Sequence, residues 1–331
     1  MKNVPVLLIG GVGRSGTNLL KNLLSLHSEV CSLPFEARFT IDPDGIIPTY
    51  VLLKNAWSPF VSEKAIKRLN IFLNKLSHKN FLDKVAINFS NIFTHVGLDG
   101  NIKSYKEWDL KTSFPNFEVY NDKLINDIKL LEYQGTWAGR KGSLTRKALN
   151  TVGLSNKNNQ LDTIFREYFN NLYQDLLKSK KKSLYVEDNT FNILYANYYE
   201  QLLPGAFMIH MIRDPRDVVA SYIKQRWCPK NIELAVKYYI ELMERWFSIK
   251  KNLNKNFYVE IKLEELCKNT NLVLNKLTEK VFIKFDKNAF NYDLSNSNTG
   301  RWRKEFDENN QKFLNKKLDK YIKHFGYNDK F

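Results

Sequence analysis

A glycine-rich segment near the N-terminus constrains the fold of this chain more than any other feature. An apolar run, Val4–Gly10, leads into Gly11-Val12-Gly13-Arg14-Ser15-Gly16-Thr17-Asn18, and Thr17–His27 then carries leucines at helical spacing opposite polar residues. A continuous apolar run of this kind is typical of a parallel strand covered on both faces. The order of strand, glycine loop and helix therefore predicts the first half of a βαβ unit.

A second strand and helix follow the same plan in the C-terminal half. Ala206–Ile212 is apolar and is predicted to be a buried strand. The next helix, Pro215–Arg226, begins with an acidic N-cap, Asp214, and a proline at its first position. Shorter strands are predicted at Ser183–Val186 and Phe257–Ile261. We therefore predict a three-layer α/β domain, P-loop-like, with a central parallel sheet.

The middle of the chain, about residues 45–180, is predicted to consist mostly of helices and loops. Helical periodicity is present over Ala65–Leu76 and Leu161–Leu177, and glycines punctuate Gly135–Gly142 as they do in loops. No internal repeat is present, and no long polar linker separates two domains. The chain is therefore predicted to be one domain, residues 1–331, with a helical insertion that covers the site and shapes the choice of substrate.

The glycine loop has the composition of a phosphate-binding loop. Its glycines let successive backbone N–H groups turn toward an anion, and the start of the following helix adds partial positive charge. The spacing of Gly11 and Gly16 is that of a nucleotide triphosphatase loop, but Thr17 and Asn18 stand where such a loop has Lys-Ser/Thr. Those residues grip the terminal phosphate and magnesium of a triphosphate, and the cation here is Arg14 instead. The sequence therefore predicts a phosphate site with no metal ion.

Two segments carry a resemblance to a known family. Arg14-Ser15-Gly16-Thr17 resembles the 5′-phosphosulfate loop of sulfotransferases that use 3′-phosphoadenosine 5′-phosphosulfate (PAPS). Arg213 and Ser221 resemble that family's 3′-phosphate segment, in which an arginine at a strand end and a serine eight positions later hold the 3′-phosphate. The resemblance implies PAPS as donor and 3′-phosphoadenosine 5′-phosphate (PAP) as product. It implies donor binding by Gly13, Arg14, Ser15, Gly16, Thr17, Asn18, Arg213 and Ser221.

A basic segment near the C-terminus adds to this resemblance. Gly300-Arg301-Trp302-Arg303 resembles a closing segment that packs over the nucleotide in relatives. Arg301, Trp302 and Arg303 are therefore further candidates for donor binding. A basic surface turn is the alternative interpretation.

The acceptor side of the reaction needs a group that removes a proton. Glu36 and Arg38 resemble the Glu-x-Arg of tyrosylprotein sulfotransferases and their bacterial relatives, in which the glutamate is the base. The resemblance implies that Glu36 is the base and that Arg38 orients Glu36 or the acceptor. Arg14 is predicted to neutralise charge on the leaving phosphate. A salt-bridged surface pair is the alternative for Glu36 and Arg38.

A histidine base is the alternative for the proton acceptor, because cytosolic aryl and steroid sulfotransferases use one. His27 is predicted at the end of a helix and His210 within a buried strand, which leaves His95 as the least implausible base. His78 and His324 have no recognisable context. Val186–Thr190 resembles a family segment that ends in Thr-Pro near the acceptor, although Phe191 replaces the proline.

Composition limits the partners and the compartment. The formal charge of +16 favours anionic ligands, but the lysines are scattered and form no nucleic-acid-binding pattern. Three cysteines without paired spacing fit a reducing compartment, and no apolar run approaches the roughly 20 residues that span a bilayer. We therefore predict a cytoplasmic enzyme, with no nucleic-acid partner and no transmembrane segment.

The predicted reaction is sulfuryl transfer from PAPS to a hydroxyl, with an amine as the second choice of acceptor. Sugar, lipid, peptide tyrosine and small metabolite all stay open as acceptors, and so does the oligomeric state. The alternative enzyme is a P-loop nucleoside or small-molecule kinase. The alternative from another class is a basic nucleic-acid-binding protein.

Overall fold

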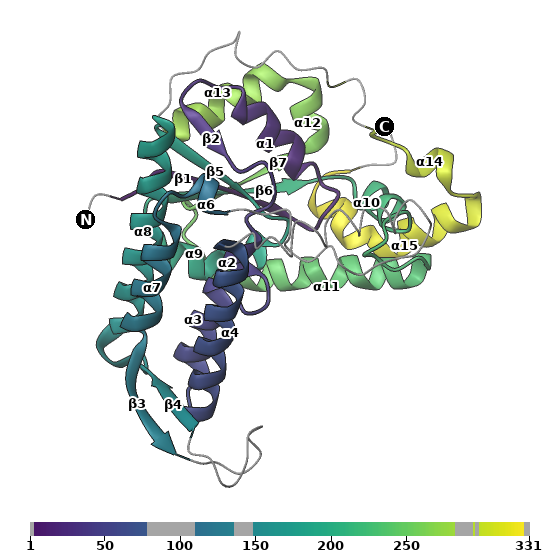
Figure 1. The fold of residues 1–331 in the computed structure, drawn as a ribbon. Coiled ribbons are helices and arrows are strands. Elements are labelled where there is room, and N and C mark those ends of the chain that lie inside the picture. The colour runs from purple at the N-terminus through teal and green to yellow at the C-terminus, as the bar shows by residue number, and fades with distance from the viewer. Residues whose placement is uncertain (1–2, 78–109, 136–147, 282–293, 295–297, 328–331) are drawn as a thin grey trace, which may run out of the picture. The chain divides into compact units, whose positions relative to one another are not determined.

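The computed structural model describes residues 3–77, 110–135, 148–281, 294 and 298–327 (Figure 1). The chain divides into two compact units. Residues 5–36, 181–200 and 204–331 form one of them, which we call the sheet unit. Residues 1–4, 37–180 and 201–203 form the other, which we call the helical unit.

A five-stranded parallel sheet is the centre of the sheet unit. The strands lie in the order β2-β5-β1-β6-β7, and every pair of neighbours is parallel. Their bounds are β1 (Val6–Gly11), β2 (Val30–Ser32), β5 (Leu184–Asp188), β6 (Ala206–Ile212) and β7 (Tyr258–Lys262). The predicted α/β class with a central parallel sheet is confirmed.

Helices cover both faces of this sheet (Figure 1). On one face, strand residues such as Ile9 and Ile209 form a buried core with α1 (Thr17–Ser25), α12 (Leu263–Lys268) and α13 (Thr270–Lys280). On the other face, Trp246 of α11 (Ile232–Lys250) packs against His210, with ring centroids 4.9 Å apart. The remaining helices of this unit are η2 (Asn192–Tyr195), α9 (Ala196–Leu202, whose last two residues belong to the helical unit), α10 (Pro215–Tyr222), α14 (Trp302–Glu305) and α15 (Glu308–His324).

The alternation of side chains along β5 places its two acidic residues on opposite faces of the sheet. Val186 belongs to the core beneath α1, so Asp188, two residues later, lies on that same face. Glu187 faces the other way and accepts a hydrogen bond of 2.7 Å from the hydroxyl of Tyr199. Only Asp188 is therefore on the side of the sheet that carries α1 and the glycine loop.

The helices that flank the two predicted motifs are shorter than their periodicity predicts. The first ends at Ser25 rather than His27, and α10 ends at Tyr222 rather than Arg226. In both places backbone N–H groups just past the helix end bond to the carbonyl three residues back, as Gln225 does to Tyr222 at 2.8 Å. These tight turns end the α-helix while the apolar spacing continues.

The helical unit contains the long helices predicted for the middle of the chain. The predicted segments Ala65–Leu76 and Leu161–Leu177 lie within α4 (Pro59–Ser77) and α8 (Gln160–Lys180). Asp162 of α8 is buried and accepts a hydrogen bond of 2.6 Å from the hydroxyl of Tyr50. The other helices are α2 (Arg38–Ile41), α3 (Ile46–Asn55), α6 (Leu110–Ser113), α7 (Phe117–Asp127) and η1 (Lys157–Asn159).

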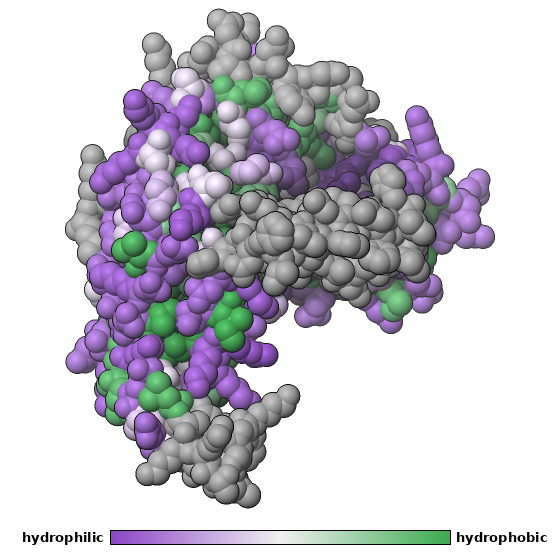
Figure 2. Space-filling model, in the orientation of Figure 1, coloured by the Kyte–Doolittle hydropathy of each residue, from purple (hydrophilic) through white to green (hydrophobic). Residues whose placement is uncertain are grey.

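An antiparallel hairpin in this unit was not predicted. It pairs β3 (Lys129–Gly135) with β4 (Ala148–Gly153). Leucines 130, 131 and 149 are exposed on it, and Figure 2 shows small separate apolar patches on an otherwise largely hydrophilic face. Beyond Gly135, the predicted loop up to Gly142 lies outside the described residues. Within the ranges that the structure describes, no helix has the length and apolar character needed to cross a membrane.

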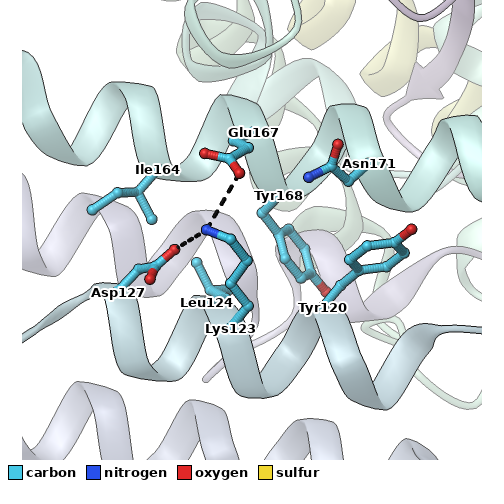
Figure 3. Close-up of a pocket in the computed structure, with 8 residues that line it drawn as sticks. All are labelled: Tyr120, Lys123, Leu124, Asp127, Ile164, Glu167, Tyr168 and Asn171. Atoms are coloured by element: carbon cyan, nitrogen blue, oxygen red, sulfur yellow. Dashed lines mark hydrogen bonds and ion pairs between the residues drawn. The ribbon is translucent and has the colours of Figure 1, made fainter.

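A small pocket lies between α7 and α8 of the helical unit. Figure 3 shows Lys123 in its wall, between the carboxylates of Asp127 and Glu167, and the distance to Glu167 is 3.3 Å. The lining residues are Tyr120, Lys123, Leu124, Asp127, Ile164, Glu167, Tyr168 and Asn171. None of the residues predicted to bind donor or acceptor lines this pocket.

The packing of α1 predicts the stability of the sheet unit. Leu23 is fully buried in the core beneath α1, whereas Leu26, just past the helix end, is 46% exposed. We expect Leu23→Ala to lower the free energy of unfolding by about 2–5 kcal/mol, since it leaves a cavity in the core. Leu26→Ala is the matched control and should change it by less than about 0.5 kcal/mol. Equal losses in chemical denaturation would contradict the placement of α1.

Candidate functional site

The carboxyl ends of three neighbouring strands meet at one edge of the sheet. Strand β1 ends at Gly11, β5 ends at Asp188, and β6 leads directly into Arg213. The backbone N–H of Gly11 donates to the carbonyl of Thr190 at 2.8 Å, which joins the glycine loop to the segment after β5. Ligands of α/β proteins bind at this edge, where the order of the strands reverses.

The glycine loop, residues 11–18, has the backbone geometry of an anion cradle. Gly13, Arg14 and Gly16 have φ angles of 82°, 58° and 95°, in the left-handed region. Backbones that combine left- and right-handed residues point successive N–H groups into one concavity. A Cβ atom on Gly13 would lie 2.9 Å from the Trp227 ring, and one on Gly16 would lie 2.7 Å from Leu263. Glycine is therefore required at both positions by conformation and by space.

The hydroxyl-bearing residues of the loop lie at different depths. Ser15 is fully buried, and its hydroxyl packs against Gly11, where a Cβ atom would lie 2.2 Å from Ser15 Oγ. No described residue is within hydrogen-bonding distance of this hydroxyl. Thr17 is buried at the first position of α1, and Asn18 is exposed. The loop therefore holds a buried hydroxyl without an acceptor next to its backbone cradle.

The structure brings the two predicted phosphate-binding segments into direct contact. Nε of Arg14 donates to Oγ of Ser221 at 2.9 Å, across 207 positions of sequence. Nη1 of Arg213 donates to the backbone carbonyl of Arg14 at 3.1 Å. The hydroxyl of Tyr222 also donates to the carbonyl of Val12 in the loop. The glycine loop and the start of α10 therefore form one connected site.

Arg213 is a buried cation, and one of its N–H groups has no hydrogen-bond acceptor among the described residues. Its side chain is 6% exposed, and it donates to the carbonyl of Asn298 at 2.6 Å and lies 3.8 Å from Asp217. Its Nε has no partner among the described residues. Burial lowers the pKa of Arg213 most, and the nearby charges of Arg301 and Arg14 lower it further, against the opposite effect of Asp217. A buried N–H without a partner costs about 1–3 kcal/mol, so this arrangement favours a bound anion.

Asp217 of α10 forms hydrogen bonds to the backbone of the predicted closing segment, residues 300–303. This fully buried carboxylate accepts hydrogen bonds from the backbone N–H of Gly300 at 2.6 Å and of Trp302 at 3.0 Å. The Trp302 ring lies beside two guanidinium groups, 4.1 Å from that of Arg216 and 4.6 Å from that of Arg303. The closing segment is therefore anchored near Arg213.

Arg301 has a partner within its own helical turn. Its guanidinium forms an ion pair of 2.7 Å with Glu305, which also pairs with Lys224 at 2.8 Å. The charge of Arg301 nevertheless reaches Arg213 and lowers its pKa. Sequence analysis did not assign Asp217 a role, although it stands in the same Arg-Asp-Pro-Arg-Asp run as Arg213.

Glu36 is held by a residue that sequence analysis left without a role. Oγ1 of Thr190 donates to Oε1 of Glu36 at 3.0 Å, and Glu36 is half-buried. Its carboxylate is therefore fixed beside the segment that follows β5 while part of it stays accessible. Arg38, the other predicted acceptor-side residue, is exposed and forms an ion pair of 2.9 Å with Asp42 in the helical unit.

A second carboxyl group, that of Asp188 at the end of β5, is close enough to Glu36 for the two charges to interact. It is 2% exposed, and among the described residues neither oxygen accepts a hydrogen bond of good geometry, although the hydroxyl of Thr17 lies close enough to interact with it. Burial raises the pKa of Asp188 to about 7, and the charge of Glu36 adds to this, while Lys21 and Thr17 oppose it. Among the described residues, no three His, Cys, Asp or Glu side chains gather as a metal site would require.

The described histidines make contacts with residues outside the glycine loop and the Glu36 segment. His210 lies in β6, as predicted, and its Nδ1 is 3.1 Å from Glu260. Burial lowers the pKa of His210. His27 accepts a hydrogen bond at Nδ1 from the backbone of Glu29, and His324 packs against the Phe247 ring. His78 and His95 lie outside the described residues.

Known proteins with similar sequence or structure are sulfotransferases. A sequence profile of the sulfotransferase family matches residues 124–287, and no curated protein matches the chain. The sulfotransferase domain of the olefin synthase from Synechococcus PCC 7002 aligns with 99% of this chain and 97% of its own, at 14% identity and a TM-score of 0.51. This likeness shows a shared fold.

Two more solved structures are less similar. The sulfotransferase domain of the curacin biosynthetic pathway aligns with 95% of this chain and 97% of its own, at 12% identity and a TM-score of 0.45. A sulfotransferase (STF9) from Mycobacterium avium aligns with 98% of this chain and 78% of its own, at 13% identity and a TM-score of 0.42.

The fold is that of an α/β protein with an arginine-lined glycine loop at the carboxyl edge of its sheet. The sulfotransferase profile matches residues 124–287, just under half of the chain, and the fold is shared with a sulfotransferase domain, which together support an enzyme of the PAPS-dependent sulfotransferase class. Members of this family generally take the sulfuryl group from PAPS and release PAP.

The anchoring of the closing segment gives a direct prediction. In Asp217→Ala, the N–H groups of Gly300 and Trp302 lose their acceptor. A lost bond of this kind costs about 1–3 kcal/mol, so hydrogen exchange of these two amides should become faster by roughly 5- to 150-fold. Asp319→Ala, which removes an exposed ion pair with Lys323 on α15, is the control and should leave both amides unchanged. Unchanged exchange in Asp217→Ala would show that the segment is held by other contacts.

Proposed function

We propose that this enzyme transfers the sulfuryl group of PAPS to a hydroxyl acceptor. The donor is bound by the sheet unit, through the backbone N–H groups of the glycine loop and the arginines beside it. We further propose that it acts in the cytoplasm, which agrees with the three free thiols, Cys31, Cys228 and Cys267.

The observation that carries this proposal is the contact of Arg213 with the glycine loop. A nucleotide with phosphates at both its 3′ and 5′ positions needs two groups of donors close together. The loop backbone supplies one group, and Arg213 with Ser221 supplies the other. The unpartnered Nε of Arg213 and the nearby charges of Arg14 and Arg301 favour a dianion at this place. The Lys-Ser/Thr pair of a triphosphate loop is absent from the same loop.

The chain's own residues supply the rest of the chemistry. Glu36 accepts the proton of the acceptor hydroxyl as the new S–O bond forms and the bond from sulfur to the phosphate oxygen breaks. The electron pair of the broken bond leaves with PAP, and Arg14 stabilises this charge. Thr190 keeps Glu36 in place through its 3.0 Å hydrogen bond. A hydroxyl fits such a base better than an amine, because a neutral amine attacks without prior loss of a proton. We keep Arg38 as a group that orients the acceptor.

The 3′-phosphate gives the sharpest test of the donor. We expect PAP to bind more tightly than ADP by about 10²–10⁴, because two charge-assisted contacts contribute about 1.5–3 kcal/mol each. Arg213→Ala should remove most of this preference and change ADP binding little. Arg245→Ala, an exposed arginine on α11, is the matched control. Equal affinities of the wild-type protein for PAP and ADP in calorimetry would contradict the proposal, and tighter binding of ATP with magnesium would favour the kinase.

Glu36 gives a test of the acceptor side. Incubation with PAPS and a set of hydroxyl compounds, read by mass spectrometry as the gain of a sulfate, identifies a working acceptor. With that acceptor, Glu36→Gln should lower kcat by roughly 10²–10⁴, since the base is lost, and should leave PAP affinity at about pH 6 within about threefold. Glu29→Gln, an exposed glutamate after α1, is the control. Wild-type turnover in Glu36→Gln would exclude this base.

A further inference from the structure

Asp188 is a buried carboxyl group close to the glycine loop. It ends β5, which pairs with β1 in parallel, and Asp188 stands opposite Ile9, two residues before the loop begins. The side chain is 2% exposed, and in the described part of the chain the hydroxyl of Thr17 interacts with it without forming a hydrogen bond of good geometry. Ser15 of the same loop carries a second buried polar group without a partner. Two buried polar groups without a well-formed hydrogen bond therefore flank one predicted anion cradle.

The charged and titratable groups around Asp188 come from three elements. Helix α1 contributes Lys21 and the hydroxyl of Thr17, both of which favour the ionised carboxylate. Glu36, which follows β2, acts in the opposite direction, as does the neighbouring Glu187. Within β5, burial raises the pKa of Tyr185, and the charge of Asp188 adds to this effect. Burial outweighs the two favourable groups and raises the pKa of Asp188 to about 7.

An anion on the glycine loop adds a negative charge next to this carboxyl group. Thr17 is the first residue of α1, whose N-terminus is the positive end of the predicted cradle, and Thr17 also interacts with Asp188. In a site with little water, an ionised carboxylate would repel the bound phosphate. A neutral carboxylic acid does not, and it gains an O–H that can donate a hydrogen bond.

We propose that Asp188 belongs to the donor site as a neutral carboxylic acid, and that binding of the donor's 5′-phosphate is coupled to the uptake of one proton by this group. This inference rests on the proposed function, because the donor is the anion concerned. The proton comes from solvent and forms one O–H bond on the Asp188 carboxylate. No bond of the nucleotide changes in this step.

The direction of the pH dependence follows from the two states of Asp188. Without ligand its pKa is about 7, and with the anion bound its pKa is higher. Below about pH 7 the group is protonated in both states, so this group leaves the affinity unchanged. As the pH rises through about 7, the free protein loses the proton first, and the affinity for PAP falls by at most tenfold per pH unit.

The test is calorimetry of PAP binding to the full chain at about pH 6 and about pH 8, in two buffers of different ionisation enthalpy. At about pH 8, PAP binding to the wild-type protein should be accompanied by the uptake of one proton that is not taken up when PAP binds to Asp188→Asn. The side chain at position 188 of this variant is uncharged at both pH values. The variant should therefore bind PAP as tightly as the wild type at about pH 6, and roughly tenfold more tightly than the wild type at about pH 8. Titration of PAP's own phosphates is the same for both proteins and cancels in the comparison.

Glu36→Gln provides a second arm that keeps Asp188 intact. Removing the charge of Glu36 lowers the pKa of Asp188, so the loss of PAP affinity should begin at a lower pH than in the wild type. This arm tests the proposal even if Asp188→Asn does not fold. If PAP affinity depends on pH in the same way in the wild type and in Glu36→Gln, the proposal is overturned.

The remaining outcomes separate this inference from the proposed function. Absence of PAP binding by the wild-type protein contradicts the proposed function. PAP binding that is weaker in Asp188→Asn than in the wild type at both pH values means that the ionised carboxylate is required, and it overturns the inference alone. The same holds if magnesium strengthens PAP binding in the wild type and not in the variant, since Asp188 would then be a metal ligand.

Discussion

The hydrogen bond from Arg213 to the carbonyl of Arg14 is the contact on which the rest of the site depends. It joins the end of β6 to the loop after β1, at the edge where parallel strands end. The same guanidinium donates to Asn298, which lies just before the closing segment. Because Arg213 is buried, these bonds are made in a medium of low dielectric, where they are stronger than at the surface. Three segments far apart in the sequence therefore share one cation.

Asp217 completes this arrangement one helical turn later. It is fully buried, partly compensates the charge of Arg213, and holds two N–H groups of the closing segment. Burial raises the pKa of Asp217, while the bond to Trp302 and the charge of Arg213 oppose that effect. The run Arg213–Asp217 thus combines a buried cation with a buried carboxylate that lies 3.8 Å from it. Such a division of roles explains why the two charged residues lie four positions apart on one helix start.

Much of the sheet unit could be predicted from the sequence. Continuous apolar runs identified four of the five strands, and Ala206–Ile212 was predicted with both its bounds. Residue types and local spacing single out the glycine loop, Arg213, Ser221 and the closing segment, and the structure brings these residues together. The short strand β2 was not assigned bounds, and the hairpin β3–β4 was missed, since its exposed leucines do not alternate with polar residues as in a half-buried strand.

The contacts that complete the site could not be predicted, because they depend on strand order. Thr190 reaches Glu36 only because β5 lies between β2 and β1 in the sheet. Asp188 lies opposite Ile9 of β1 for the same reason, and an acidic residue at the end of a strand gives no signal of its own. The bond between Arg14 and Ser221 likewise joins residues that sequence analysis assigned to different phosphates. Local pattern gives the residue types of such a site, while the topology decides which of them meet.

A crystal structure of the protein with PAP tests the central claim most directly. The account predicts the 5′-phosphate on the backbone N–H groups of the glycine loop, and the 3′-phosphate within hydrogen-bonding distance of Arg213 and Ser221. PAP bound elsewhere, or bound at the loop with its 3′-phosphate in solvent, would contradict it.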